Sequence, residues 1–406
     1  MTDLRIIVNA IISFSFILPQ KIPQEVGMDP SFAANIIYVT ERGIQLGAYP
    51  GAAVVIGKDS AIIVEKGIGR VEWNGEVVRP AETMYDLASL TKIVSPTLAA
   101  MYLYDKDKLD ILAKVKTYIP EYPHDNVHIW NLLTHTAGLP AGKSLPKNRG
   151  TEEYKRLIIN SRLIYKPGTH YLYSDLSAII MGIVIERITK MPLDKFVKDS
   201  IYTPLHLKST MYLPDTSFYY RIAPTDNSRG KVSDPIAKKL GGVSGNAGVF
   251  STADDLAIIA QLMLNKGEIN GYRLFSRQTY WVFTSNWGHS RGLGWQMCDS
   301  SYGCGNFPKS SFGHTGYTGT SIWIDPEKKL FVVILTNRLD NPKTHASQKM
   351  LSAIRTDIVN LALGGTVPDT SKVTKFEINK LTDELARKER IRKQHRHKRV
   401  VKHKKK

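Results

Sequence analysis

Two residues that can cooperate in nucleophilic chemistry, Ser89 and Lys92, stand three positions apart. Serine is a weak nucleophile until a neighbouring base takes its proton. Residues three apart on a helix share one face, so the Lys92 amine could reach the Ser89 hydroxyl. The pair therefore predicts an activated serine nucleophile, provided that a helix carries both residues.

The Ser-x-x-Lys pattern occurs three times in the chain, and context separates the copies. Ser144–Lys147 contains a proline and Ser228–Lys231 contains a glycine, so neither is typical of a regular helix. Only Ser89 lies between a strand-like segment, Thr83–Leu87, and a mostly apolar run, Leu90–Leu103. We therefore assign the nucleophile to Ser89.

The junction before this helix could also bind a developing oxyanion, because backbone N–H groups are free at a helix N-terminus. Pro96 lies inside the apolar run. A proline in a helix interior removes a hydrogen bond and clashes with the preceding turn. We expect it to bend the helix, or to break it near Val94.

Two further short segments could position a proton and contact a substrate. Tyr171-Leu-Tyr-Ser-Asp175 opens a predicted helix and places Tyr173 two residues before Asp175. Gly313-His-Thr-Gly-Tyr-Thr-Gly-Thr320 precedes a predicted strand, and its glycines allow another group to approach the backbone closely. Each segment alone is weak evidence, but the three segments together indicate a catalytic site.

The elements around these motifs predict a sheet whose chain detours through helices. Ala52–Gly57 and Ala61–Lys66 form a predicted hairpin, and Thr320–Ile324 with Leu330–Leu335 forms another. The predicted helices are Glu152–Ser161, Asp175–Thr189, Leu193–Ser200, Ala253–Asn265 (after the cap Ser251-Thr252) and His345–Leu363. This order favours an antiparallel sheet with a helical insertion.

The motifs resemble those of the serine-reactive β-lactamase-related hydrolases, which include class C β-lactamases, penicillin-binding DD-peptidases and esterases. Ser89–Lys92, Tyr173–Asp175 and His314–Gly316 match the family's Ser-x-x-Lys, Tyr-x-Asn and Lys/His-Thr-Gly in order and rough spacing. The resemblance runs from about Pro30 to about Leu363, and further segments that look like family signatures are Leu132–Leu139, Gly241–Leu256, Gly292–Trp295 and Gly313–Pro326.

The resemblance implies a β-lactamase/transpeptidase-like α+β fold, with an antiparallel sheet flanked by helices plus an all-helical subdomain and the site between them. The expected hydrolase domain covers residues 21–366, with its sheet part at about 30–80 and 290–365 and its helical part at about 81–289. Residues 1–20 would be a signal-like or anchor segment, and residues 367–406 a basic, disordered tail.

The resemblance also implies an acyl-enzyme mechanism without metal or organic cofactor. Ser89 would attack a carbonyl, Lys92 and Tyr173 would manage its proton, and Tyr173 would later activate the deacylating water. The backbone N–H groups of Ser89 and Tyr317 would form the oxyanion hole. The remaining motif residues would bind the substrate: Asp175, His314, Thr315 and Gly316.

Two positions depart from the commonest family pattern. Asp175 stands where the family has Asn, and a negative neighbour favours the charged form of Lys92 and raises its pKa. This shifts the role of base towards Tyr173. His314 stands where true β-lactamases have Lys, and His at this position is commoner among peptidase-like and esterase-like members of the family.

A competing nucleophile, Ser290, lies in Gly288-His-Ser-Arg-Gly292, which matches the Gly-x-Ser-x-Gly elbow of α/β-hydrolases. That motif needs a strand before it and a helix after it. The following segment, Leu293–Met297, has no helical run, so we expect Ser290 to be a loop residue. His135 and His170 are expected to be structural, because no metal-binding spacing is present.

The charge of the chain is concentrated at its end. The 406 residues carry a net charge of +18, and 42% of them are hydrophobic, which is an ordinary globular composition. Arg387–Lys406 holds twelve Lys or Arg and one Glu, a net charge of +11, which leaves +7 for the rest. We expect a solvated tail that could attach to an anionic surface or polymer, with no specific nucleic acid.

The first residues and the two cysteines leave the compartment open. Ile6–Leu18 is an apolar run that is too short to span a bilayer, so it is either a signal-like segment or a helix that packs on the domain. Cys298 and Cys304 could form a disulfide in an exported protein or remain thiols in the cytosol. An extracytoplasmic or membrane-associated protein is expected if the first segment is a signal or anchor.

The sequence thus predicts a serine hydrolase that cleaves an ester or amide, with a small ester or a D-amino-acid peptide as substrate. The alternatives are a true β-lactamase and a non-catalytic penicillin-binding-like protein that recognises wall peptides. The motifs are silent on the oligomeric state.

Overall fold

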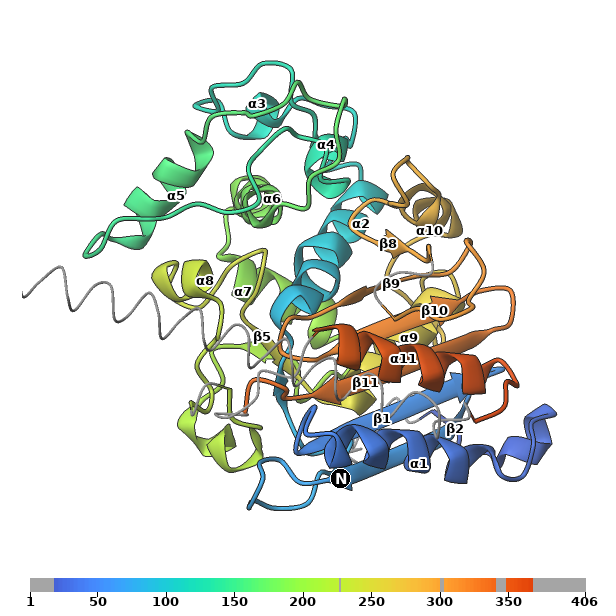
Figure 1. The fold of residues 1–406 in the computed structure, drawn as a ribbon. Coiled ribbons are helices and arrows are strands. Elements are labelled where there is room, and N and C mark those ends of the chain that lie inside the picture. Colours follow the sequence, from blue (N-terminus) through green and yellow to red (C-terminus); the bar gives the residue numbers. More distant parts are fainter. Residues whose placement is uncertain (1–17, 226–227, 300–302, 341–347, 368–406) are drawn as a thin grey trace, which may run out of the picture. The chain divides into compact units, whose positions relative to one another are not determined.

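The computed structural model describes residues 18–225, 228–299, 303–340 and 348–367. Within them, six antiparallel strands form one sheet in the order β2-β1-β11-β10-β9-β8 (Figure 1). The strands are β1 (Gly51–Lys58), β2 (Ala61–Gly69), β8 (Gln296–Met297), β9 (Phe312–Thr315), β10 (Ser321–Asp325) and β11 (Leu330–Thr336). Both predicted hairpins are present, as β1–β2 and β10–β11.

Helices cover both faces of this sheet. In Figure 1, α1 (Phe32–Gln45) and α11 (Gln348–Ala362) lie in front of the strands, and α9 (Ala253–Leu264) lies behind them. All seven residues of β11 are buried as a result. A strand with both faces covered reads as a continuous apolar run instead of an alternating one, which is why Leu330–Leu335 was recognisable in the sequence.

The long segment between β2 and β8 holds most of the helices. Besides α9, these are α2 (Leu98–Asp105), α3 (Val115–Tyr118), α4 (Ile129–Leu133), α5 (Thr151–Ile159), α6 (Asp175–Thr189), α7 (Leu193–Val197), α8 (Pro235–Lys239) and α10 (Arg277–Thr284). Helix α6 is at its centre, and ten consecutive residues of it, Leu176–Ile185, are buried. A helix that is apolar on all sides packs inside a domain. Helix α6 can therefore hold its N-terminal residues rigidly.

The same segment contains more than helices. Short strands β3 (Tyr85–Asp86), β5 (Val249–Ser251) and β4 (Met211–Tyr212) form a second sheet, and β6 (Glu268–Ile269) pairs with β7 (Tyr272–Arg273). Short 3₁₀-helices occur at η1 (Pro23–Val26), η2 (Ala88–Leu90) and η5 (Thr216–Arg221), and π-helical turns at η3 (Ile93–Thr97) and η4 (Lys198–Tyr202).

Pro96 does not break the helix that follows Ser89. It lies inside the π-helical turn η3, which runs directly into α2. A π-turn widens the helix by one residue, so it accommodates a residue that cannot donate the usual hydrogen bond. The expectation of a break near Val94 was therefore wrong.

Both ends of the chain lie mostly outside the described residues. The chain divides into two compact units, Met1–Gly365 and Thr366–Lys406, and the expected tail from residue 368 onward is not described. Of the expected signal-like segment, only Leu18–Gln20 is described, and Ile62 of β2 donates a backbone hydrogen bond to Pro19. No described helix is long and apolar enough to cross a membrane.

The two cysteines, Cys298 and Cys304, form a disulfide, with Cα atoms 5.8 Å apart. It closes the loop that leads from β8 towards β9. The loop is anchored on α11, because the N–H of Asn306 donates to the Asn360 side chain at 2.8 Å. Of the two states that the sequence left open, the structure has the oxidised one.

Candidate active site

Ser89 lies at the point where β3 turns into helix, as its sequence context predicted. The preceding residue, Ala88, has a positive φ of 47°, which is an unfavourable conformation for a residue with a side chain. The buried carboxylate of Asp86 holds it there by accepting the Ala88 N–H at 2.9 Å. The second oxygen of Asp86 accepts the N–H of Ser233 at 2.7 Å. Asp86 thus fixes the backbone that presents the nucleophile.

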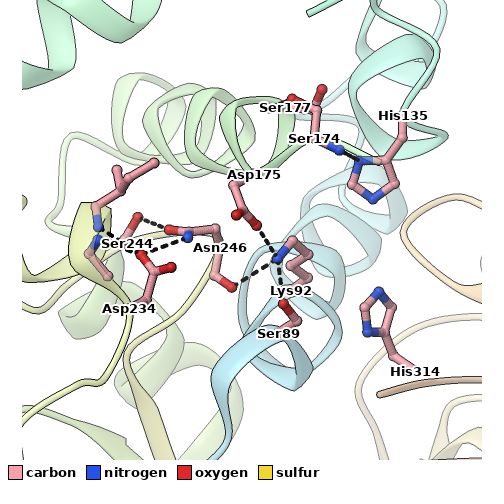
Figure 2. A network of polar contacts seen from close by, with 12 residues as sticks. Ser89, Lys92, His135, Ser174, Asp175, Ser177, Asp234, Ser244, Asn246 and His314 are labelled. Atoms are coloured by element: carbon pink, nitrogen blue, oxygen red, sulfur yellow. Dashed lines mark hydrogen bonds and ion pairs between the residues drawn. The ribbon is translucent and has the colours of Figure 1, made fainter. Parts of the chain in front are cut away.

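Lys92 lies one helical turn further on and points back at Ser89. Its Nζ lies 2.9 Å from Ser89 Oγ, 2.7 Å from Asp175 Oδ1 and 3.1 Å from the Asn246 carbonyl oxygen (Figure 2). Lys92 is buried, whereas the Asp175 side chain remains 27% exposed. The structure therefore brings the predicted pair together and adds a third partner, the Asn246 carbonyl, that the motifs did not reveal.

The electrostatics of this cluster favour a charged lysine. Burial alone would lower the pKa of Lys92, but the negative charges of ionised Tyr173 and Asp175 outweigh burial and raise that pKa. Lys92 is then cationic and donates its hydrogen bond to Ser89 Oγ instead of accepting the proton of the serine.

Tyr173 lies among groups that fix its ring. The Lys92 Nζ is 4.9 Å and the Arg291 guanidinium 5.7 Å from the ring centroid, which are cation–π distances. The His135 ring lies 4.7 Å away, and its Nδ1 accepts the N–H of Ser174 at 3.2 Å. Ser174 in turn caps α6 by accepting the Ser177 N–H. His135 therefore supports the segment that carries Tyr173.

The second predicted oxyanion donor, the N–H of Tyr317, belongs to the turn between β9 and β10. Among the described residues, neither the N–H of Ser89 nor that of Tyr317 donates to a protein acceptor. The turn is tied to the nucleophile segment because Thr318 Oγ1 donates to the Asp86 carbonyl at 2.6 Å and Thr320 Oγ1 to the Leu87 carbonyl at 2.9 Å. These two bonds set the spacing between the proposed donors.

Gly316 allows the close approach of this turn to the Leu87 carbonyl, and His314 adds a neutral side chain beside it. A Cβ on Gly316 would lie 2.3 Å from the Leu87 carbonyl oxygen, so only glycine allows the approach. Burial, and then the charges of Arg291 and Lys92, hold the pKa of His314 well below its ordinary value. His314 is neutral, and its Nδ1 donates to the Thr315 carbonyl at 2.8 Å. The segment Gly313–Thr320 precedes a strand, β10, as expected, and its first residues, His314 and Thr315 among them, themselves belong to strand β9.

These residues line one cavity of about 660 Å³. Its walls contain the predicted Ser89, Tyr173, Asp175 and the stretch from His314 to Tyr317, and also residues that the motifs did not reveal, among them Ser233, Asp234, Arg291, Gln296, Arg338, Lys349 and Arg355. The basic side chains outnumber the two carboxylates, so the cavity favours a substrate that carries negative charge.

Arg291 is the most informative of the missed residues. It lies in Gly288–Gly292, the segment considered only for its serine. Ser290 lies in a loop between α10 and β8, with no strand before it, so the structure excludes a nucleophile elbow there. The signal that could have found Arg291 is its position immediately before Gly292-Leu-Gly-Trp295, a segment that resembles the family.

No group of three or more His, Cys, Asp or Glu side chains within the described part of the chain is arranged to hold a metal ion. The site consists of a serine, a buried lysine, a tyrosine and paired backbone N–H groups. These are the parts needed to attack a carbonyl and bind the resulting oxyanion.

Comparison with known proteins agrees with this arrangement. The family model described as Beta-lactamase matches residues 40–356, which include every motif discussed above. The chain belongs to the Beta-lactamase family. This membership, together with the antiparallel sheet flanked by helices, confirms the family and the fold class predicted from the sequence.

Several relatives resemble the chain over most of its length. A putative D-alanyl-D-alanine carboxypeptidase of Salmonella agona is 32% identical and aligns over 80% of this chain and 87% of its own. An N-acetylmuramyl-L-alanine amidase of Bacillus subtilis is 34% identical and aligns over 74% and 80%. Both names describe hydrolases.

Solved structures share the fold of the chain. A β-lactamase/D-alanine carboxypeptidase of Pseudomonas syringae is 18% identical, covers 83% of this chain and 100% of its own, and has a TM-score of 0.67. EstCE1, described as a hydrolase with promiscuous acyltransferase activity, is 22% identical, covers 81% and 98%, and has a TM-score of 0.65.

Proposed function

We propose that the protein is a serine hydrolase that attaches the acyl part of an ester or amide to Ser89 and then releases it to water. The observation that supports this most strongly is the position of Lys92 Nζ, 2.9 Å from Ser89 Oγ and 2.7 Å from Asp175 Oδ1. A lysine buried beside a serine in a solvent-open cavity has no evident role in folding, since burying a charge costs free energy.

In the proposed acylation, Ser89 Oγ attacks the carbonyl carbon and its proton passes to the Tyr173 oxygen, which reacts as a phenolate. Lys92 stays cationic and stabilises negative charge on Ser89 and on the Tyr173 oxygen. The carbonyl oxygen becomes an oxyanion and accepts hydrogen bonds from the N–H groups of Ser89 and Tyr317. The leaving group takes the proton from Tyr173, and Tyr173 later takes a proton from the deacylating water.

This division of roles favours esters. An alcohol or phenol leaves with little help, whereas the nitrogen of an amide must be protonated as it departs. If Lys92 is held as a cation, only Tyr173 shuttles protons, and general acid catalysis is weakened. We therefore propose a preference for activated short-chain acyl esters and weak turnover of β-lactams.

A D-amino-acid peptide is the second proposed substrate, and Arg291 is the observation that favours it. A neutral His314 offers no fixed positive charge at its own position to hold a substrate carboxylate. Arg291, in the wall of the same cavity, supplies such a charge. A peptide that ends in a carboxylate is the substrate class named for the Salmonella relative.

The test is a comparison of kcat/KM for a nitrophenyl acetate-type ester, a cephalosporin and a D-Ala-D-Ala peptide, with the full-length protein between pH 5 and 10. We expect the ester to be cleaved most efficiently. If the peptide is cleaved faster than the ester, the protein is a carboxypeptidase and not an esterase. If the cephalosporin is cleaved fastest, it is a β-lactamase. Absence of turnover for all three would favour the non-catalytic recognition protein.

A further inference from the structure

We propose that Asp234, in the wall of the substrate cavity, is a positioning residue for both members of the Ser89–Lys92 pair. It belongs to a two-residue wall segment, Ser233–Asp234. One residue of the wall segment is bonded to the side chain that holds the nucleophile, and the other to the residue that holds the lysine. The inference rests on the proposed function, because it assigns a role in the reaction of Ser89.

The first bond of the wall segment leads to the nucleophile. The N–H of Ser233 donates to one carboxylate oxygen of the buried Asp86 at 2.7 Å. The other oxygen of Asp86 accepts the N–H of Ala88, the residue before Ser89, at 2.9 Å. A displacement of the wall segment therefore acts on the nucleophile through a single buried side chain.

The second bond of the wall segment leads to the lysine (Figure 2). Asp234 Oδ1 accepts a hydrogen bond from Asn246 Nδ2 at 3.1 Å. The backbone carbonyl oxygen of Asn246 accepts one from Lys92 Nζ, also at 3.1 Å. Since the amide and the carbonyl belong to one residue, a bond that fixes the amide also restrains the carbonyl. Asp234 therefore helps to hold an acceptor in place for Lys92.

Asn246 is buried, and its surroundings leave the side chain little freedom. Ser244 Oγ donates to Asn246 Oδ1 at 2.6 Å, so both ends of the amide are bonded. A Cβ on the intervening Gly245 would lie 2.0 Å from the carbonyl oxygen of Ala178 in α6, so the backbone passes directly against that helix. A buried polar network whose groups are bonded makes the structure around it rigid. Asn246 can therefore pass a displacement of Asp234 on to the carbonyl that Lys92 contacts.

A further tie joins the loop of Asn246 to the helix that carries Lys92. The Tyr212 hydroxyl lies 2.8 Å from the Ser244 carbonyl oxygen and 2.9 Å from Ser95 Oγ. Ser95 lies three residues after Lys92, in the π-helical turn η3, and both Ser95 and Tyr212 are buried. The loop is thus fixed to the lysine helix from inside the protein, and Asp234 ties it to the cavity wall.

Asp234 also caps α8, and this role has to be separated from the proposed one. Its Oδ1 accepts the N–H groups of Ile236 at 3.0 Å and Ala237 at 2.7 Å. The same oxygen therefore serves the cap and the bond to Asn246. Asparagine at this position keeps an oxygen acceptor for all three donors, whereas alanine removes it.

The test is the rate at which a fluorophosphonate reacts with Ser89 in full-length Asp234→Ala and Asp234→Asn, corrected for folded fraction. We expect alanine to slow this phosphonylation about tenfold, because misplaced reacting atoms lose rate steeply. Asparagine should react at nearly the parental rate. A parental rate in Asp234→Ala, or an equal loss in both variants, would overturn the inference.

Turnover of the nitrophenyl ester distinguishes positioning from substrate binding, since Asp234 lines the cavity. We expect kcat of Asp234→Ala to fall about tenfold, with a KM within about twofold of the parental value. A raised KM with an unchanged kcat would show that Asp234 contacts the substrate without positioning the pair, which contradicts the inference.

Ala237→Gly is the matched control for the cap. Ala237 is a buried residue of α8, and glycine loosens this helix while every bond of the Asp234 side chain can still form. We expect its phosphonylation rate to stay near that of the parent. A loss as large as that of Asp234→Ala would show that Asp234 acts only by capping α8, and the inference would fail.

Asn246→Ala tests the path to the lysine, because it keeps the backbone carbonyl that Lys92 contacts and removes only the amide. We expect a loss of about tenfold in the phosphonylation rate. The double variant with Asp234→Ala should be no slower than the slower single variant, because both changes break the same link. Losses that multiply in the double variant would show two independent effects and would contradict the inference.

Hydrogen–deuterium exchange separates this outcome from that of the proposed function, because it needs no reaction at Ser89. We expect the amides of residues 86–92 to exchange faster in Asp234→Ala than in the parent, and at the parental rate in Asp234→Asn. Such a difference, together with no phosphonylation of the parent, would end the hydrolase proposal and leave the link from the wall segment to the pair standing. Parental exchange and parental phosphonylation in Asp234→Ala would do the reverse.

Discussion

At the scale of single residues, the charge state of the site depends on Asp175, which stands where the family motif has Asn. Asp175 accepts a hydrogen bond from Lys92 at 2.7 Å, whereas an amide there would carry no charge. The carboxylate favours the cationic form of Lys92, which in the proposed mechanism leaves Tyr173 as the proton carrier. The sequence could predict this because the motif spacing identifies all three residues and electrostatics gives the sign of the pKa shift.

The variant Asp175→Asn tests that sign. Removing the carboxylate lowers the pKa of Lys92, so the loss of activity at high pH, which follows deprotonation of Lys92, should begin at a lower pH than in the parent. The measurement is kcat/KM for the nitrophenyl ester across pH. If the pH dependence of kcat/KM is the same in the variant and the parent, Asp175 does not influence the pKa of Lys92.

Asp86 is a residue that the motifs did not reveal. Its side chain accepts the N–H groups of Ala88 and Ser233, and its carbonyl accepts Thr318 Oγ1, so it connects three segments of the site. The sequence could not predict this role, because Ser233 and Thr318 lie more than 140 positions away and come near only in the fold.

We expect Asp86→Asn to slow phosphonylation of Ser89 by a fluorophosphonate about tenfold or more. The Asn amide can accept only one of the two N–H groups, and misplaced reacting atoms lose rate steeply. Asp255→Asn is the matched control. Asp255 is also buried and accepts two hydrogen bonds, from Ser209 and Thr210, but it lies away from the cavity. Similar phosphonylation rates in the two variants, after correction for folded fraction, would contradict the positioning role of Asp86.

At the scale of elements, helix starts were predictable and local irregularities were not. Helix α6 begins at Asp175, as expected, because a serine cap precedes a continuous apolar run. The π-turn around Pro96 was missed, since the sequence shows only that a normal turn is disfavoured. The strained loop at His289 was missed too, because neither His nor Ser announces a positive φ.

The start of α9 gives a prediction about stability. Burial and the neighbouring Glu65 and Asp255 raise the pKa of Asp254 to about 7. Between pH 3.8, the ordinary pKa of an aspartate, and about pH 7, Asp254 is therefore protonated in the native state and ionised in the unfolded chain. Stability from this group is present in acid and is lost as the pH rises towards about 7.

Asp254→Asn cannot ionise, so the variant does not lose stability as the pH rises. We expect the variant to have a higher Tm than the parent at pH 8 and nearly the same Tm at pH 4.5, measured by thermal unfolding. Asp199→Asn changes an exposed carboxylate and is the control. The difference between its Tm at pH 4.5 and its Tm at pH 8 should equal that of the parent. A lower Tm of Asp254→Asn at pH 8 would show that the ionised carboxylate stabilises the fold.

At the scale of the whole molecule, the order of hairpin, helices and hairpin was enough to predict the α+β architecture. What the order could not give is how distant segments meet. Ser89, Asp175 and Asn246 all contact Lys92, yet 154 positions separate Lys92 from Asn246. Only the family motifs, read together, placed the first two in one site.

The basic tail belongs to this scale as well, because its +11 charge dominates the net charge of the chain. Removing Arg387–Lys406 should leave turnover of a small soluble ester unchanged and weaken retention on vesicles that contain anionic lipid. The loss of retention should be largest at low salt, where charges are least screened. Reduced ester turnover in the truncated chain would instead show that the tail supports the catalytic domain.

The central claim, that Ser89 is the nucleophile, is tested most directly by covalent labelling. The full-length protein is treated with a fluorophosphonate, and separately with a penicillin-type probe, and the labelled peptide is identified by mass spectrometry. We expect a label on Ser89, no label in Ser89→Ala, and parental labelling in Ser290→Ala. A label on Ser290, or on any residue other than Ser89, would contradict the claim.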